Sequence, residues 1–300
     1  MTTQLMRLTA QKLEIDTSPE AFGTLRNSMD IVDDGLALRE RMREDGYLYL
    51  PGYLDRDEVL SVRTVVLERL ADAGWIEPGT PLEAAIARKD SSSAFAPELA
   101  QDNPPLMRLL YNGRMMVIYH RLLGGEVRHF DFTWMRAVTP GQGTPPHCDI
   151  VYMGRGTTNL YTAWTPLGDI PLEVGGLMLL ENSHKNDRLR ETYGRKDADE
   201  YCSNKNDGAT TGFGSTGTIT FNPVKLRERL GGRWLTANFQ AGDLLTFSMY
   251  TVHCSLDNHS DQMRLSSDSR YQLASEPADE RWIGENPIGH GLAAKRGKIC

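Results

Sequence analysis

The stretch EVRHFDFTWMRAV, residues 126–138, marks the point where the hydrophobic period of the chain changes from about 3.6 residues to two. Aromatic and mostly polar side chains alternate along it, with Phe130, Phe132 and Trp134 on one face and His129, Asp131, Thr133 and Met135 on the other. A strand with a polar second face is typical of a barrel wall around a wet lumen. We therefore expect a β-barrel to begin here.

Helices are predicted before this strand and further strands after it. Asp55 has the character of an N-cap, with Glu58 at the capping-box spacing, and apolar residues then recur at helical spacing up to Gly74. A second helix is expected over residues 105–123, ending at Gly124-Gly125. The later strands are expected at residues 158–166, 176–180, 218–222, 234–239, 243–248 and 263–274.

This order of elements indicates an α+β, mainly β fold. We expect a double-stranded β-helix, that is, a jelly roll or cupin-like barrel, with flanking N-terminal helices. The prediction is a single domain over residues 1–300, in which residues 1–125 form mostly helical support, residues 126–275 the barrel core and residues 276–300 a C-terminal tail. Residues 187–217 are charged and glycine-rich, and we expect a long insertion there that closes over one end of the barrel.

Composition excludes several classes of partner. The net charge of −7 argues against nucleic acid or an anionic membrane surface as the main partner. No apolar run approaches the roughly 20 residues that a membrane span needs, and the N-terminus lacks the pattern of a secretory signal. The four cysteines form no C-x-x-C pair, which favours free thiols and a cytoplasmic location. Nothing in the sequence indicates an oligomeric state.

A candidate metal site begins at His147 and Asp149, which one residue separates in TPPHCDIVYM. On an extended segment, residues two apart point the same way, so an imidazole and a carboxylate converge while Cys148 points elsewhere. A later strand leads to His253, which completes a set of two histidines and one carboxylate. Such a set holds iron(II) on one face and leaves positions open for a cosubstrate and O2.

Arg264 follows His253 by eleven residues and lies on the next expected strand. Its planar guanidinium suits the distal carboxylate of 2-oxoglutarate, because it can donate two parallel charge-assisted hydrogen bonds. Ser255 lies two residues after His253 and its hydroxyl could donate to the same carboxylate. Two alternatives stay open: Arg264 could pair with a carboxylate such as Asp268, and Arg270, on the same face, could be the anchor instead.

These motifs resemble the phytanoyl-CoA dioxygenase family of iron(II)- and 2-oxoglutarate-dependent oxygenases. The resemblance covers most of the chain. It rests on DGYLYLPGYLDRDEV (45–59), the H-x-D motif, YTAWTPLGDIPLEVGGLMLLENSHK (161–185) and the H-x-S…R pattern. It implies that Met135 and Trp164 line the 2-oxoglutarate pocket, and that Lys89 corresponds to a family lysine near the cosubstrate.

The expected reaction is oxidation of a substrate C–H bond, most simply hydroxylation, coupled to conversion of 2-oxoglutarate and O2 to succinate and CO2. Desaturation, ring formation and epimerisation are alternative outcomes, and Asp149 argues against halogenation. The substrate is expected to be a small organic metabolite or a natural-product intermediate, with a coenzyme A thioester as an alternative. Two other classes stay open: a metal-binding barrel without activity, such as a sensor, and a zinc or manganese isomerase or hydrolase of the cupin type.

Overall fold

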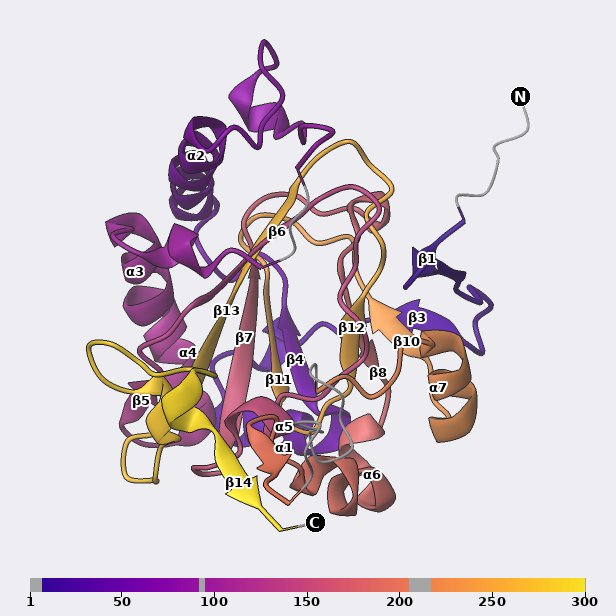
Figure 1. Cartoon of the computed structure of the whole chain (residues 1–300), viewed down its shortest axis with the longest axis vertical. Coiled ribbons are helices and arrows are strands. Elements are labelled where there is room, and N and C mark those ends of the chain that lie inside the picture. The colour runs from indigo at the N-terminus through magenta and orange to yellow at the C-terminus, as the bar shows by residue number, and fades with distance from the viewer. Residues whose placement is uncertain (1–6, 92–94, 205–216, 300) are drawn as a thin grey trace.

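Two β-sheets lie face to face in the computed structural model, which describes residues 7–91, 95–204 and 217–299 (Figure 1). The larger sheet has the strand order β4-β11-β7-β13-β5, and β6 also pairs with β13. Its strands are β4 (Tyr47–Leu50), β5 (Val127–His129), β6 (Trp134–Val138), β7 (Leu160–Pro166), β11 (Leu244–Ser248) and β13 (Arg264–Leu273). The smaller sheet has the order β12-β8-β10-β3. Its strands are β3 (Phe22–Thr24), β8 (Leu177–Leu180), β10 (Trp234–Thr236) and β12 (His253–Ser255). This is the expected double-stranded β-helix, or jelly roll.

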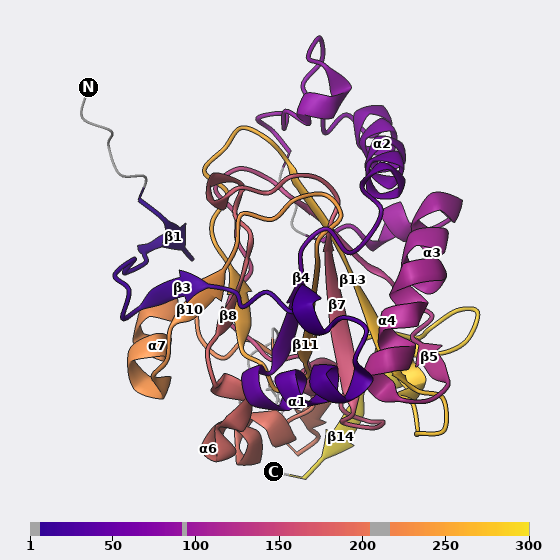
Figure 2. The ribbon, with the colours of Figure 1, turned by 180° about the vertical axis from the view of Figure 1, so that it is seen from behind.

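Helices cover the outer faces of both sheets. On the larger sheet lie α1 (Gly35–Asp45), α2 (Arg56–Asp72), α3 (Pro104–Tyr111) and α4 (Gly113–Leu123), as Figures 1 and 2 show from opposite sides. The predicted N-cap at Asp55 is confirmed, because its carboxylate accepts hydrogen bonds from the backbone N–H groups of Asp57 and Glu58. The buried face of α2 consists of the apolar residues at helical spacing, Val59, Val62, Val66, Leu67 and Leu70.

Alternation along the strands divides the interior into a lumen and two outer cores. Between the sheets, Trp164, Leu245, Phe247 and Leu179 belong to an apolar cluster that fills the closed part of the lumen. The core between the larger sheet and the helices includes Met135, Leu265 and Tyr271. A third core packs around Trp234 outside the smaller sheet, under α7 (Pro223–Leu230), and its apolar cluster continues to Trp134 and Trp282.

Two of the predicted elements are wrong. The single helix expected over residues 105–123 is two helices, because Asn112 is extended and Gly113 has a φ of 53°. The strand expected at residues 218–222 is absent from the described structure. Asn222 is instead the N-cap of α7, and its side chain accepts from the backbone N–H of Lys225. Short apolar stretches do not distinguish a strand from the approach to a helix.

The stretch 126–138 also departs from its prediction, because it forms two strands, β5 and β6, with residues 130–133 between them. Met135 pairs across the sheet with Ser267 and lies in the core beneath the helices. Trp134 pairs with Asp268 and Arg136 with Ser266, so both belong to the lumen face. The expectation that the face containing Met135 lines the lumen is therefore wrong.

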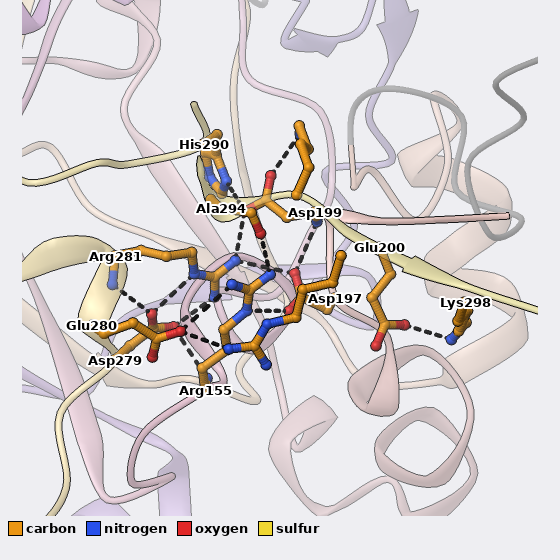
Figure 3. Close-up of polar contacts among 12 residues, drawn as sticks. Arg155, Asp197, Asp199, Glu200, Asp279, Glu280, Arg281, His290, Ala294 and Lys298 are labelled. Atoms are coloured by element: carbon orange, nitrogen blue, oxygen red, sulfur yellow. Dashed lines mark hydrogen bonds and ion pairs between the residues drawn. The ribbon is translucent and has the colours of Figure 1, made fainter. Parts of the chain in front are cut away.

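The segment after α6 (Asp187–Glu191) contacts the C-terminal segment through a strand pair and a group of ion pairs. Strand β9 (Glu200–Cys202) pairs in parallel with β14 (Arg296–Lys298), and β1 (Thr9–Ala10) pairs separately with β2 (Leu13–Glu14). Buried Arg281 donates to Asp199 at 2.7 Å and to Asp197 at 3.0 Å (Figure 3). Residues 205–216 of the expected insertion lie outside the described residues.

The cysteines differ in state. Cys148 and Cys254 are free and buried, whereas Cys202 is disulfide-bonded, so the expectation that all four thiols are free is wrong. No helix in the described part of the chain is long and apolar enough to cross a membrane.

Candidate metal centre

Three side chains converge at one end of the lumen, as the sequence predicts. Asp149 directly precedes the short helix α5 (Ile150–Met153), and His253 opens β12. The backbones of His147 and His253 exchange two hydrogen bonds, each of 3.0 Å. This pairing places both histidines beside the carboxylate: Asp149 Oδ1 lies 3.8 Å from His147 Nε2 and 3.7 Å from His253 Nε2. One donor atom from each residue lies within 4.8 Å of the others, a spacing that fits a single metal ion.

Backbone carbonyls orient the two imidazoles. His147 Nδ1 lies 2.8 Å from the carbonyl oxygen of Pro145, and His253 Nδ1 lies 3.0 Å from that of Thr251. A carbonyl oxygen can only accept, so each Nδ1 carries the hydrogen and each Nε2 presents its lone pair toward Asp149. Both rings are thus in the tautomer that binds metal through Nε2.

The protonation states of the three residues also suit a cation. Burial lowers the pKa of His147 to about 3, and the neighbouring His253 adds to this effect. Burial likewise lowers the pKa of His253. For Asp149, burial would raise the pKa, but the charge of Arg270 and the two histidines hold it well below its usual range. At neutral pH the site therefore offers one carboxylate and two neutral imidazoles, the forms that a divalent metal requires.

The lumen also holds an arginine with two nitrogens that lack a hydrogen-bond partner among the described residues. Arg264, on β13, is 1% exposed, and neither its Nε nor its Nη2 has a hydrogen-bond partner among the described residues. Nη1 makes only a long contact of 3.4 Å with Ser266 Oγ. Burial, reinforced by the charge of Arg136, lowers the pKa of Arg264 to about 9, so it remains a cation at neutral pH. A buried, unpaired cation is costly, and a ligand carboxylate in front of it would remove that cost.

Of the other residues expected around the cosubstrate, two lie at the lumen and two do not. Ser255 is fully buried, and its Oγ accepts from the backbone N–H of Thr144 at 2.8 Å, which leaves the hydroxyl hydrogen able to donate. Trp164 faces the lumen, opposite Asp268, and its Nε1 has no partner in the described structure. Met135 lies on the far face of the sheet and Lys89 is exposed, so the structure brings neither to the metal donors.

The two free cysteines next to the ligands are not part of the donor set. Cys148 points into the outer core, where its thiol donates to the carbonyl oxygen of Tyr250 at 3.4 Å, and Cys254 is buried in the same core. Burial raises the pKa of both thiols well above the usual value, so neither is a thiolate at neutral pH. Strand alternation therefore directs them as predicted.

Sequence reasoning missed the residues that hold Asp149 in place. Thr162, on β7, donates to Asp149 Oδ2, and Arg270 Nη2 lies 3.1 Å from the same oxygen. It also missed Arg136, whose Nε donates to Asp268 Oδ2 at 2.8 Å. Asp268 is thus paired with Arg136, and no ion pair joins it to Arg264. The sequence signal for these ion pairs is that Arg264, Asp268 and Arg270 share one face of β13.

A double-stranded β-helix with two histidines and a carboxylate at one end of its lumen, and an unpaired buried arginine in the same lumen, defines an iron(II)- and 2-oxoglutarate-dependent oxygenase. The chain belongs to the phytanoyl-CoA dioxygenase family, whose family model matches residues 42–266. The donor set described above fits the metal of that class, and unpaired Arg264 fits its anionic cosubstrate.

One relative and two solved structures illustrate the similarity. A 1-deoxypentalenic acid 11-beta-hydroxylase from Streptomyces exfoliatus is 28% identical over 255 residues, which cover 82% of this chain and 83% of the relative. Among solved structures, the carbocyclase SnoK from nogalamycin biosynthesis has a TM-score of 0.59 at 20% identity, covering 81% of this chain and 85% of SnoK. EctD from S. alaskensis, solved with 2-oxoglutarate and 5-hydroxyectoine, has a TM-score of 0.56 at 17% identity, covering 100% of this chain and 94% of EctD. The two structures share the fold.

Proposed function

We propose that this enzyme hydroxylates an aliphatic C–H bond of a small organic metabolite or natural-product intermediate. One substrate C–H, one 2-oxoglutarate and one O2 give one C–OH, one succinate and one CO2. The two atoms of O2 are divided between the new hydroxyl and succinate. The relative named as a hydroxylase supports this outcome. SnoK, named as a carbocyclase, shares the fold, so the fold alone does not select between hydroxylation and ring formation.

The observation that carries the proposal is the unpaired guanidinium of Arg264. Sensor barrels and zinc hydrolases have no need of a buried cation in the lumen, whereas a 2-oxoglutarate enzyme must neutralise the distal carboxylate of its cosubstrate. Arg264 supplies N–H donors with no partner among the described residues, at a position buried enough to exclude water.

Each residue then has a role. His147, Asp149 and His253 would hold iron(II), which when bound would supply the redox chemistry for activating O2. Arg264 binds the distal carboxylate of 2-oxoglutarate, and Ser255 donates its hydroxyl hydrogen to the same group. Trp164 walls the cosubstrate pocket, and its Nε1–H is free to donate to a ligand oxygen. The lumen residues thereby orient 2-oxoglutarate and keep water away from it.

Titration of the metal-free protein with iron(II), with and without 2-oxoglutarate, tests this proposal. We expect one iron(II) per chain, 2-oxoglutarate affinity that depends on the metal, and succinate formation that requires both. His147→Ala and His253→Ala should abolish turnover, because two remaining donors cannot hold a labile iron(II). Turnover in either variant at the wild-type rate would contradict the proposed ligands. Iron-independent turnover with zinc or manganese would contradict the reaction.

A further inference from the structure

Of the three lumen arginines, Arg136 is the one whose side chain is partly exposed to solvent. Arg136 lies on β6, on the same face as Arg264 and Arg270, and its side chain is 19% exposed. Arg264 and Arg270 are 1% and 2% exposed. Arg136 donates through Nε to Asp268 Oδ2, and its two terminal nitrogens have no hydrogen-bond partner among the described residues. Asp268 thus orients the guanidinium through Nε, and both terminal nitrogens can still donate to a ligand.

Arg136 lies on the lumen face of the larger sheet, the face that also carries Arg270, whose Nη2 lies 3.1 Å from Asp149 Oδ2. The charge of Arg136 interacts with the carboxylate of Asp149 and with Tyr152. The ring of Tyr152 meets that of His147 edge-on at 5.7 Å between centroids. Arg136 therefore borders the space beside the metal donors, where a substrate C–H bond must lie for oxidation.

The ionised side chains of the lumen carry one more positive charge than negative charges. Among the described residues, its ionised side chains are Arg136, Arg264, Arg270, Asp149 and Asp268, which together carry one net positive charge. Iron(II) and 2-oxoglutarate carry equal and opposite charges, so the bound pair leaves this excess unchanged. A low-dielectric site with an uncompensated charge favours a ligand that brings the opposite charge.

We propose that Arg136 binds a carboxylate on the primary substrate, so that the enzyme acts on a singly charged organic acid. This proposal rests on the proposed function above and adds the substrate class. The two terminal nitrogens of a guanidinium match the two oxygens of a carboxylate. A single excess charge favours a carboxylate over a dianionic phosphate monoester. Asp268 holds the guanidinium through its hydrogen bond to Nε, and the two terminal nitrogens are left to donate to the ligand.

Matched ligands test the proposal on two readouts. The panel consists of apolar cyclic carboxylic acids, the methyl ester of each acid, and the phosphate ester of the corresponding primary alcohol. Each compound is screened for stimulation of succinate formation by the enzyme loaded with iron(II) and 2-oxoglutarate. Calorimetric binding of the best acid to the protein loaded with nickel(II) and 2-oxoglutarate is measured in parallel, without turnover. We expect the acids, and neither the esters nor the phosphates, to bind and to stimulate.

Variants then assign the binding to Arg136. Arg136→Gln should weaken acid binding by at least about tenfold, since at least one charge-assisted hydrogen bond is lost. Its 2-oxoglutarate affinity should fall much less than its affinity for the acid. Arg136→Gln combined with Asp268→Asn avoids leaving a buried carboxylate unpaired and should show the same loss. Arg136→Lys should restore part of the affinity. The control is Arg128→Gln on the exposed side of β5, which should change neither affinity.

Several outcomes would overturn the assignment. Equal binding of acids and esters would show that the enzyme does not recognise the carboxylate. Stronger binding of the phosphates would show that the site prefers a dianion. A loss of 2-oxoglutarate affinity in Arg136→Gln, with acid binding unchanged, would assign Arg136 to the cosubstrate. Failure of the proposed function looks different: the wild-type protein would then form no succinate with iron(II) and 2-oxoglutarate, whatever acid is added.

Discussion

Arg270 Nη2 lies 3.1 Å from Asp149 Oδ2, and both side chains are 3% exposed. Thr162 donates to the same oxygen, so Oδ2 is held by two protein groups. The other oxygen, Oδ1, faces Nε2 of both histidines. Asp149 is therefore oriented to bind a metal through one oxygen, and Arg270 acts as a positioning residue for that carboxylate.

Replacing Arg270 should affect the metal more than the cosubstrate. Arg270→Gln should lower iron(II) affinity by about 10- to 100-fold, the usual effect of losing a group that orients a ligand. Thr162→Val should act in the same direction but less strongly, because a neutral hydrogen bond is weaker than a charge-assisted one. Iron(II) titration at saturating 2-oxoglutarate measures both. If Arg270→Gln binds iron(II) normally and loses 2-oxoglutarate instead, Arg270 is the cosubstrate anchor.

The cysteines beside the ligands should tolerate substitution. Cys148→Ser and Cys254→Ser should each bind one iron(II), because both side chains point into the outer core, away from the donors. Their stabilities should differ. The hydroxyl at position 148 can donate to Tyr250 as the thiol does, whereas Cys254 has no hydrogen-bond partner among the described residues. We expect Cys254→Ser to lose about 1–3 kcal/mol of unfolding free energy and Cys148→Ser less. Loss of iron(II) without loss of stability would contradict the side-chain directions.

Acid should weaken the contact between the C-terminal segment and β9. Burial would raise the pKa of Asp199, but hydrogen bonds from Lys295, His290 and Arg281 outweigh it and lower the pKa to about 2. A depressed carboxyl pKa gives stability that is complete above the unfolded-state value near 4 and is lost as the pH falls toward 2. The contribution is about 2 kcal/mol, because each pKa unit corresponds to about 1.4 kcal/mol.

Denaturant unfolding at several pH values measures this contribution. Asp199→Asn should be less stable than the wild type at neutral pH, and the difference should shrink by about 2 kcal/mol between about pH 5 and about pH 2. Asp72→Asn, at an exposed position at the end of α2, is the control and should leave the pH dependence unchanged. A constant difference between wild type and Asp199→Asn would show that the network contributes no pH-dependent stability.

The donor set could be predicted because it depends on local chain geometry. One intervening residue directs His147 and Asp149 to one point and turns Cys148 away, whatever the rest of the fold does. Alternation along β13 likewise predicts that Arg264, Asp268 and Arg270 share one face. Which partner each would take depends on contacts across the barrel. Asp149 and Arg270 are 121 positions apart, and no spacing rule relates them.

The face of β6 could not be predicted from polarity. Both faces of the larger sheet are buried, one under helices and one against the lumen, so alternation does not say which is which. The polar residues His129, Asp131 and Thr133 suggested the lumen, but residues 130–133 separate two strands. Met135 consequently faces the helices, and Arg136 occupies the lumen position.

The most direct test of the cosubstrate site is Arg264. Arg264→Ala should weaken 2-oxoglutarate binding by about a hundred- to several-thousand-fold, because two charge-assisted hydrogen bonds worth roughly 1.5–3 kcal/mol each are lost and are replaced only in part by water. Iron(II) affinity should change little, since no ion pair or hydrogen bond joins Arg264 to the three donors in the described structure. Arg264→Lys should recover only part of the loss, because an ammonium lacks the planar fork. Titration with 2-oxoglutarate at saturating metal measures these effects.

Replacing Arg264 should have the opposite effect on the stability of the protein without ligands. Nε and Nη2 of Arg264 are buried without partners, so the free protein carries the desolvation cost of a cation that is compensated only when a carboxylate binds. Arg264→Met, which fills similar space without charge, should therefore be as stable as the wild type or more stable in the absence of 2-oxoglutarate. With saturating 2-oxoglutarate the order should reverse, because ligand binding stabilises only the protein that binds it. Thermal unfolding with and without the cosubstrate shows both. A variant that is strongly destabilised even without 2-oxoglutarate would mean that Arg264 is a structural cation, and the anchor would have to be sought among the other lumen arginines.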